Sequence, residues 1–200
     1  MMHARAGRRS ARGVATLVVF TLVAGMAPVM PAHAATTLAN LSAVPARMSC
    51  TLEAFQKLSL KGAVDHGGAV TFTAVSLVDA SSSNPSAYCS VRGTVGPGAS
   101  SIVMKLPMSA WTQRYVQNGC GGECGTDNLG NPSQSTGCVP VSNGSLVTAT
   151  TNMGHTSSQG STWNVDNPWA AIDFAYRGVH MASQVAKAVM LQFYGRPPAY

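Results

Sequence analysis

The stretch Ala170–Gly195, "AAIDFAYRGVHMASQVAKAVMLQFYG", is the longest helical pattern in the chain. Six apolar residues in it follow one another at steps of four, three, four, three and four, which places them in one stripe on a helix. They are Ala175, Val179, Ala182, Ala186, Val189 and Phe193. Gly195 suits the C′ position after a helix, and Pro197-Pro198 prevent the helix from continuing. We predict one helix with a single buried face.

Several stretches before this helix have the residue types and alternation of β-strands. They are "AVTFTAVSLV" (69–78), "YCSVRGTV" (88–95), "SIVMKLP" (101–107), "QRYVQ" (113–117) and "SLVTATT" (145–151). "GPGAS" between the second and third is a hairpin signal, and Ile102, Met104 and Leu106 alternate with Ser101 and Lys105 as in a half-buried strand. Strands followed by a strand–helix unit predict an α/β domain. Such a sheet would be incomplete, so we expect further strands beyond Tyr200.

The first 34 residues have the pattern of a secretory signal peptide. A positive start is followed by the apolar run 13–29, and Ala32-His33-Ala34 matches the small-x-small signature of signal-peptidase cleavage. The positive charges are Arg5, Arg8, Arg9 and Arg12. A membrane anchor is the alternative, but the apolar run is short and contains proline at its end. We expect a secreted or periplasmic protein that begins near Ala35, with one domain over residues 35–200 and no membrane contact after cleavage.

Removal of this leader changes the charge of the chain. The leader carries four of the thirteen Lys and Arg residues and none of the seven acidic residues, so the rest has a formal net charge of +2. In this remaining part, no cluster of Lys or Arg stands beside aromatic residues, as nucleic-acid binding would require. The composition predicts a near-neutral protein that does not bind nucleic acid.

Five cysteines follow the leader: Cys50, Cys89, Cys120, Cys124 and Cys138. Export to an oxidising compartment favours disulfides over thiolate metal sites. Because the number is odd, one thiol is free, pairs with another chain, or has its partner elsewhere. The residues alone leave the pairing open.

The stretch Val116–Asn128, "VQNGCGGECGTDN", combines four glycines with two cysteines. A Cys₃His zinc site would have the spacing C-x₃-C-x₁₃-C-x₁₆-H, from Cys120 to His155, which is less regular than most zinc knuckles. A phosphate cradle is disfavoured because the loop contains Glu123 and no Lys-Ser/Thr pair follows it. Two interpretations of this stretch remain. It is either a turn braced by a disulfide or a loop whose backbone N–H groups contact a reacting atom.

Hydrolase chemistry would need a nucleophile, a base and an oxyanion hole. No G-x-S-x-G motif occurs in the 200 residues. The histidines after the leader are His66, His155 and His180; the last lies within the predicted helix, where it is packed or on the surface. His155 follows a strand in "TNMGH", a better place for a functional residue. Residue types and spacing alone therefore predict an exported, disulfide-braced α/β domain and do not identify its function.

A series of motifs between Met48 and Tyr200 resembles one known family. In chain order they are C-x-L at Cys50, C-x-V-x-G at Cys89, "LPMSAWTQRY", "QNGCGGECG", "TNMGH", "DFAYRGVH" and "AKAVMLQFYGRPPAY". Together they resemble the N-terminal part of the tannase and feruloyl esterase family, which includes mono(hydroxyethyl) terephthalate hydrolase. Seven motifs in the right order make the resemblance specific.

This resemblance implies the N-terminal portion of an α/β-hydrolase fold with an incomplete sheet. It implies a serine carboxylic-ester hydrolase that acts on small aromatic esters of the gallate or ferulate type. In the family, a "GCS-x-GG" nucleophile elbow follows the helix, and the catalytic Asp and His come from far downstream. A lid inserted later carries a structural calcium in many members. All of these would lie beyond Tyr200, so we expect no cofactor in this chain and no activity from it alone.

The resemblance also implies site residues. Counted from Arg114 in the "W-x-x-R-Y" motif, the family's oxyanion-hole glycine falls on Gly122, with Gly121 beside it; a turn without a catalytic role is the alternative. Cys50 and Cys89 match a family disulfide. Cys124 with Cys138 is the expected brace of the glycine loop, although Cys120 would fit in place of either.

One position departs from the family. The family often has Asp two residues before "GH", where this chain has Asn152, which loses the charge and keeps most hydrogen bonds. We expect His155 and Asp173 to hold the strand and the helix together near the site. A second hypothesis for the whole chain is an exported, non-catalytic binding protein on a partial hydrolase scaffold, which would need a polar outer surface on its last helix.

Overall fold

The structure, a computed structural model, describes residues 41–65, 68–98, 100–119, 121–129 and 144–200. The predicted signal peptide (residues 1–34), Cys120 and Cys138 lie outside the described residues. Within the described part of the chain, no helix is long and apolar enough to cross a membrane.

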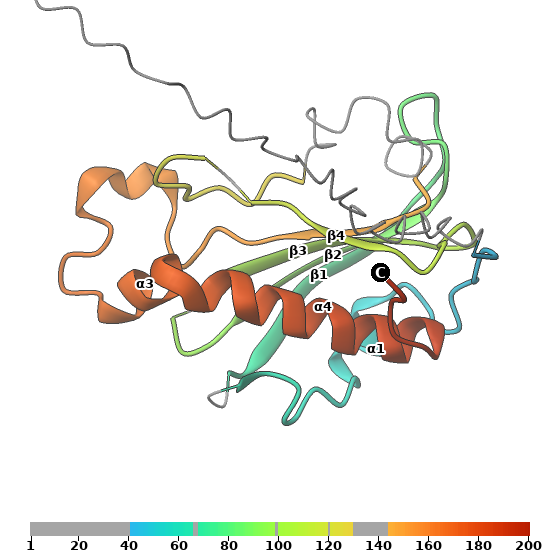
Figure 1. The fold of residues 1–200 in the computed structure, drawn as a ribbon, viewed down its shortest axis with the longest axis horizontal. Helices are drawn as coiled ribbons and strands as arrows, with labels where there is room; N and C mark the ends of the chain where they lie inside the picture. The colour runs from blue at the N-terminus through green and yellow to red at the C-terminus, as the bar shows by residue number, and fades with distance from the viewer. Residues whose placement is uncertain (1–40, 66–67, 99, 120, 130–143) are drawn as a thin grey trace, which may run out of the picture. The chain divides into compact units, whose positions relative to one another are not determined.

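Five strands form one mixed sheet in the order β1-β2-β3-β5-β4 (Figure 1). Their bounds are β1 Val70–Val78, β2 Tyr88–Val95, β3 Ser100–Pro107, β4 Tyr115–Gln117 and β5 Val147–Thr150. β1, β2 and β3 are antiparallel neighbours, β5 pairs antiparallel to β3, and β4 pairs parallel to β5. All five stretches predicted as strands therefore form strands, and the last two are shorter than predicted.

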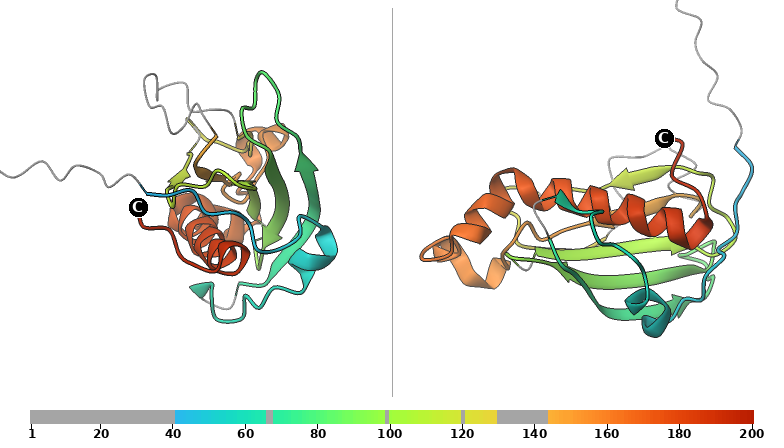
Figure 2. Two further views of the ribbon diagram at one scale, coloured as in Figure 1. Left: turned by 90° about the vertical axis from the view of Figure 1, so that its right-hand side faces the viewer. Right: turned by 90° about the horizontal axis from the view of Figure 1, so that it is seen from below.

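The helices lie before β1 and after β5. Their bounds are α1 Leu52–Gln56, the 3₁₀ segment η3 Ser157–Thr162, α3 Pro168–Ile172, the π-helical turn η4 Asp173–Arg177 and α4 Gly178–Tyr194. α4 runs along one face of the sheet (Figures 1 and 2). It ends at Gly195, whose φ of 75° is left-handed, so the C-cap prediction is confirmed.

The core lies between α4 and the sheet. The predicted inward residues of β3, Ile102, Met104 and Leu106, are each at most 1% exposed, whereas Ser101 and Lys105 are only partly buried. The face of α4 that packs against them consists of Met181, Ala182, Val185, Ala186, Val189, Met190, Phe193 and Tyr194. The alternation along β3 therefore predicted the buried face of the sheet correctly.

The predicted stripe on the helix is wrong at its N-terminal end, where Ala175 and Val179 are exposed. The π turn η4 adds a residue to one helical turn, which rotates the residues before it by roughly 100° relative to α4. Asp173 and Arg177 are buried in place of Ala175. Val179 lies beside Gln117, which donates to its carbonyl at the end of the short edge strand β4.

The predicted disulfide between Cys50 and Cys89 is confirmed, with a Cα–Cα distance of 5.5 Å. Cys89 is fully buried on β2. The bond therefore fastens the segment before α1 to the start of β2.

Candidate functional site

The carboxyl ends of β4 and β5 lie at the same edge of the sheet because these two strands are parallel. The glycine loop leaves β4 at Asn118, and the "TNMGH" loop leaves β5 at Thr151. Asn118 N donates to Ala149 O at 2.8 Å, and Thr150 Oγ1 donates to Asn118 O at 3.1 Å. The two predicted loops therefore begin side by side.

The part of the glycine loop around Asp127 lies on the face of the sheet opposite α4. Asp127, in the loop after β4, pairs with Arg92 at 3.2 Å. Arg92 lies between the buried Val91 and the inward Gly93 on β2, so its side chain is on the face opposite α4. The chain after β5 leads instead to α3 and α4. In open α/β sheets, ligands bind at the carboxyl ends of the strands.

The predicted oxyanion residues Gly121 and Gly122 form an exposed turn at this edge. Cys124 N donates to Gly121 O at 3.1 Å, and Gly122 has a φ of 60°, which favours glycine. A Cβ at either glycine would meet no heavy atom within 4 Å. Among the described residues, the N–H groups of Gly121 and Gly122 have no hydrogen-bond acceptor. As far as the described residues are concerned, these two N–H groups are therefore available as donors.

The end of this turn is fixed to the "TNMGH" loop. Ser157 N donates to Gly125 O at 2.8 Å, and a Cβ on Gly125 would lie 2.5 Å from Ser157 N. Gly125 is buried and has a φ of 78°. Cys124, directly before it, is disulfide-bonded and is not available as a thiolate zinc ligand. The predicted Cys124–Cys138 pairing stays a prediction, because Cys138 and Cys120 lie outside the described residues.

Gly125→Ala is expected to separate the two loops. The left-handed φ and the close approach of the Ser157 backbone should together lower the free energy of unfolding by about 1–3 kcal/mol. Hydrogen exchange at the Ser157 amide should become faster. Gly119→Ala is the control, because Gly119 lies on the same loop without a left-handed φ and with no atom within 4 Å of an added Cβ. Equal effects of the two substitutions would contradict the role of Gly125.

Asn152 connects the β5 loop to the β2–β3 hairpin. Its Oδ1 accepts from Ser101 N at 2.9 Å and from Gly154 N at 3.1 Å, and its own N–H donates to Ser101 Oγ. An aspartate would accept the same two bonds. The hydrogen bonds expected to survive the replacement of the family's Asp are therefore present.

Asp173 and Arg177 form a buried ion pair. Arg177 Nε donates to Asp173 Oδ1 at 2.5 Å, and Ser100 Oγ donates to Asp173 Oδ2 at 2.5 Å. Arg177 Nη1 also donates to Gly96 O at 3.2 Å, and its guanidinium lies 4.9 Å from the ring centroid of Trp169. The pair therefore fastens the π turn to the β2–β3 hairpin, so Asp173 holds helix and sheet together as expected.

His155 lies in an aromatic cluster between the β5 loop and the helices. Its ring stacks on Trp163 with centroids 4.1 Å apart and meets Phe174 edge-on at 5.7 Å. It is 4% exposed, and its Nδ1 has no hydrogen-bond partner among the described residues. These contacts make His155 a packing residue between Trp163, which follows η3, and Phe174 in η4, close to Ser157, whose N–H binds Gly125.

The end of β4 is tied to α4. Tyr115 donates its hydroxyl to Gln117 Oε1 at 2.7 Å, and Gln117 Nε2 donates to Val179 O at 2.8 Å. Burial raises the pKa of Tyr115 far above its usual range, although a hydrogen bond with Ser183 opposes the shift. Tyr115 therefore remains a neutral donor, and the strand before the glycine turn is held in place.

Sequence reasoning missed Gly125, Ser100, Trp163 and the partner role of Arg177. The i,i+4 spacing of Asp173 and Arg177 was a visible signal for an ion pair, but the same spacing occurs on exposed helices. Gly125 was one of four loop glycines, and only the approach of Ser157 distinguishes it. Within the described ranges, no group of three metal-ligating side chains is present.

Comparison with known proteins identifies the family of this chain. A family model described as "Tannase and feruloyl esterase" matches residues 89–200. The matched region includes the four strands β2 to β5, of which β2 lacks only its first residue, together with the glycine turn, the ion pair and α4. No curated protein matches the chain. The match covers more than half of the sequence, and the chain therefore belongs to the tannase and feruloyl esterase family.

Proposed function

We propose that this chain is the N-terminal part of a secreted or periplasmic serine esterase that hydrolyses aromatic esters of the gallate or ferulate type. Membership of a family of carboxylic ester hydrolases supports the reaction class. The mixed sheet with α4 along one face is compatible with the first part of an α/β-hydrolase fold. On this proposal, a later lid carries any calcium, and the reaction passes through an acyl-enzyme.

The glycine turn is the observation that carries this proposal. In α/β-hydrolases, one oxyanion donor is an N–H of a loop after an early strand, and the other follows the nucleophile. Gly121 and Gly122 lie on such a loop, at the carboxyl edge of parallel strands, with N–H groups that have no acceptor among the described residues. Fixed donors of this kind stabilise the charge that develops on the ester oxygen.

The remaining catalytic groups are proposed to follow Tyr200. Of the two described histidines, His180 contacts the carboxylate of Asp65 at 2.9 Å, and His155 stacks on Trp163. Ala199 N donates to Gln113 O at 2.8 Å, and Tyr115 N donates to Tyr200 O at 2.9 Å. The segment after α4 thus runs beside the start of β4 in the same direction. A strand continuing there would bring its carboxyl end, and a nucleophile after it, to the edge that holds the glycine turn.

Two measurements test the reaction. The 200-residue chain should not hydrolyse methyl gallate or methyl ferulate above background, because it lacks the nucleophile. The coding region past Tyr200 should encode a Cys-Ser-x-Gly-Gly elbow, and the longer protein should hydrolyse these esters. Turnover by the short chain, or a longer protein without ester hydrolysis, would refute the proposal.

Gly122→Ala should lower kcat of the longer protein by about 10²–10³-fold, because an added Cβ disturbs both the left-handed φ and the space for the ester oxygen. KM should change much less. Gly119→Ala on the same loop is the matched control and should leave kcat within about threefold. A similar loss in both variants would indicate general damage to the loop, and no loss in Gly122→Ala would exclude this glycine from the oxyanion hole.

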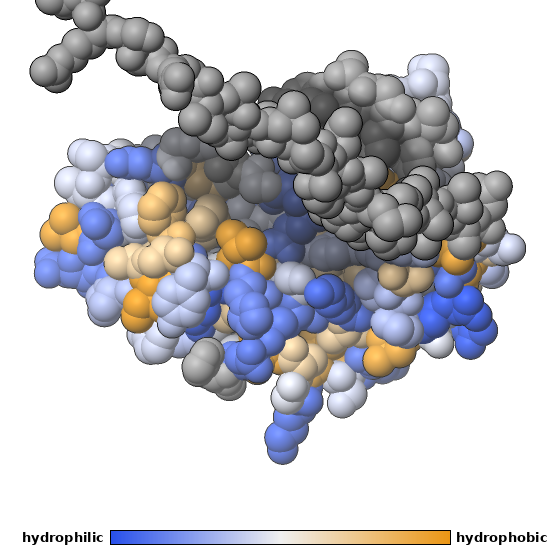
Figure 3. Space-filling model, viewed as in Figure 1, coloured by the Kyte–Doolittle hydropathy of each residue, from blue (hydrophilic) through white to orange (hydrophobic). Residues whose placement is uncertain are grey.

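The non-catalytic alternative required a polar outer surface on the last helix. Tyr176, Val179 and Leu191 are 62%, 41% and 51% exposed on η4 and α4. Figure 3 shows apolar residues gathered over α3 and the start of α4. Apolar area of this kind usually meets another surface. This favours the esterase proposal, in which more of the protein packs nearby.

A further inference from the structure

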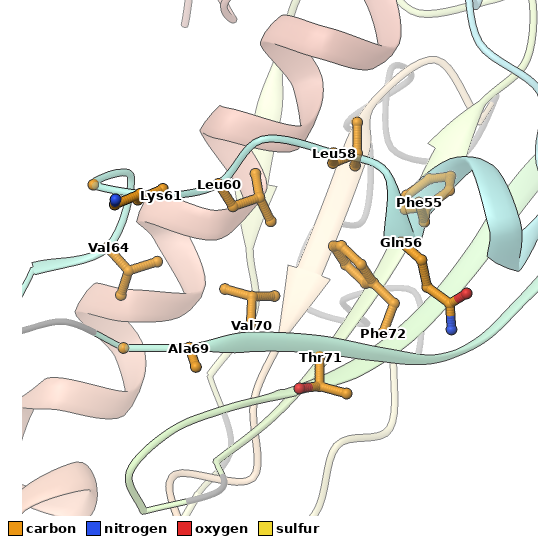
Figure 4. A pocket seen from close by; sticks show the side chains of 12 residues that line it. Phe55, Gln56, Leu58, Leu60, Lys61, Val64, Ala69, Val70, Thr71 and Phe72 are labelled. Carbon is orange, nitrogen blue, oxygen red and sulfur yellow. The ribbon is translucent and has the colours of Figure 1, made fainter.

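A cavity of about 680 Å³ lies beside β1, between this strand and the segment 56–64 (Figure 4). Leu60 and Val64 extend from the segment toward the strand, and Val70 and Phe72 extend from the strand toward them. This volume is within the range of small-molecule sites, which are mostly apolar with a few polar groups.

The outer wall of the cavity is fastened to α4 at both ends. Gln192 accepts from Ser59 N at 3.1 Å and donates to Ser59 O at 3.0 Å. Gln184 accepts from Asp65 N at 3.1 Å and donates to Asp65 Oδ2 at 2.7 Å, and His180 contacts the same carboxylate. The segment between Ser59 and Asp65 is thus held away from β1 at two points, so the cavity is built into the fold.

The cavity is separate from the candidate site. β1 and β4 are the two outermost strands of the sheet, with β2, β3 and β5 between them. Neighbouring strands are about 4.8 Å apart, so β1 and β4 are roughly 19 Å apart. A ligand beside β1 would therefore not occupy the glycine turn.

The lining combines an aromatic wall with one positive charge. Phe55 and Phe72 lie edge to face with ring centroids 5.3 Å apart. Gln56, Lys61 and Thr71 are the exposed polar residues of the lining. Lys57 is nearby but pairs with Glu53, whereas Lys61 has no acidic partner among the described residues. The charge that complements this rim is negative.

We propose that this cavity binds a small carboxylate with an aromatic body, the ring between Leu60, Val70 and Phe72 and the carboxylate near Lys61. This binding goes beyond the proposed function and does not require it. The acids released from aromatic esters belong to the same chemical class, so an active esterase would have a second place at which its acid product binds.

The test is an NMR titration of the ¹⁵N-labelled 200-residue chain with trans-cinnamate and, as the neutral control, trans-cinnamamide. Cinnamate should shift amides within 55–72 with a Kd on the order of 1 mM or tighter, as expected for a ligand of this size. Cinnamamide should bind at the same residues about threefold more weakly, because it lacks the charge. Absence of shifts in 55–72 at about 10 mM cinnamate would overturn the proposal.

Two variants assign the contacts. Lys61→Gln should weaken cinnamate binding about threefold and leave cinnamamide unchanged, while Lys187→Gln on α4 should affect neither. Leu60→Trp fills the cavity and should weaken both ligands at least about tenfold, while Leu191→Trp on the exposed side of α4 should not. Binding that is insensitive to Leu60→Trp would overturn the site. No ester is turned over in these titrations, so their failure and a failure of the proposed hydrolase activity are distinguishable.

Discussion

Asp173→Ala is expected to lower the free energy of unfolding by about 3–5 kcal/mol, because it leaves the guanidinium of Arg177 buried without its counter-charge. The two side chains are 0% and 2% exposed, so water cannot replace the lost carboxylate. Ser100 also loses the acceptor of its buried hydroxyl. Urea unfolding followed by circular dichroism measures the change, which corresponds to a fall in Tm of roughly 6–20 °C.

The chain contains a matched control for this substitution. Glu53 and Lys57 form an ion pair with the same i,i+4 spacing, but their side chains are 79% and 73% exposed. Glu53→Ala should therefore cost less than about 1 kcal/mol. The double variant Asp173→Ala/Arg177→Met should recover part of the loss by removing the unpaired charge. If Asp173→Ala and Glu53→Ala destabilise equally, the pair does not fasten the π turn to the hairpin.

Loss of the Cys50–Cys89 disulfide should have the second large effect. The bond closes a loop with a sequence separation of 39, for which the chain-entropy relation gives about 4 kcal/mol of stabilisation. Cys50→Ala/Cys89→Ala should therefore unfold at a much lower urea concentration than the native chain. The bond also holds α1, and so one end of the cavity beside β1, against the sheet.

A single substitution distinguishes the contribution of the covalent bond to stability from the contribution of packing at Cys89. Cys50→Ala breaks the bond but keeps the buried sulfur of Cys89 in the core. It should show most of the loss of the double variant, and the added Cys89→Ala should cost about 1 kcal/mol more. A loss below about 1 kcal/mol in Cys50→Ala would contradict the loop-closure account and assign the effect to packing at Cys89.

Much of the fold could be predicted because each strand has a local signature. The alternation of Ile102, Met104 and Leu106 has the period of a strand, and it identified the buried face before any partner strand was known. The end of α4 was equally local, since Gly195 and the two prolines after it determine where a helix stops. The Cys50–Cys89 bond followed from family resemblance, and the spacing of the cysteines alone would not have given it.

The errors and omissions have a common cause in contacts between distant residues. The apolar stripe failed at Ala175 because an ideal helical period cannot show a π turn, which here accompanies the burial of Asp173 and Arg177 against a hairpin about 75 residues earlier. The importance of Gly125 depends on the backbone of Ser157, which approaches it from another loop. Neither contact leaves a local pattern.

The sequence by itself determined the strands, the final helix, the glycine loop and the family, because these depend on short-range periodicity, backbone freedom and ordered motifs. The tertiary structure decided which of these meet. It inserted β5 between β3 and β4 and so brought the glycine turn and the "TNMGH" loop to one edge, with their far ends joined at Gly125 and Ser157. Strand order and loop contacts result from packing across the whole sheet, which no local stretch of residues specifies.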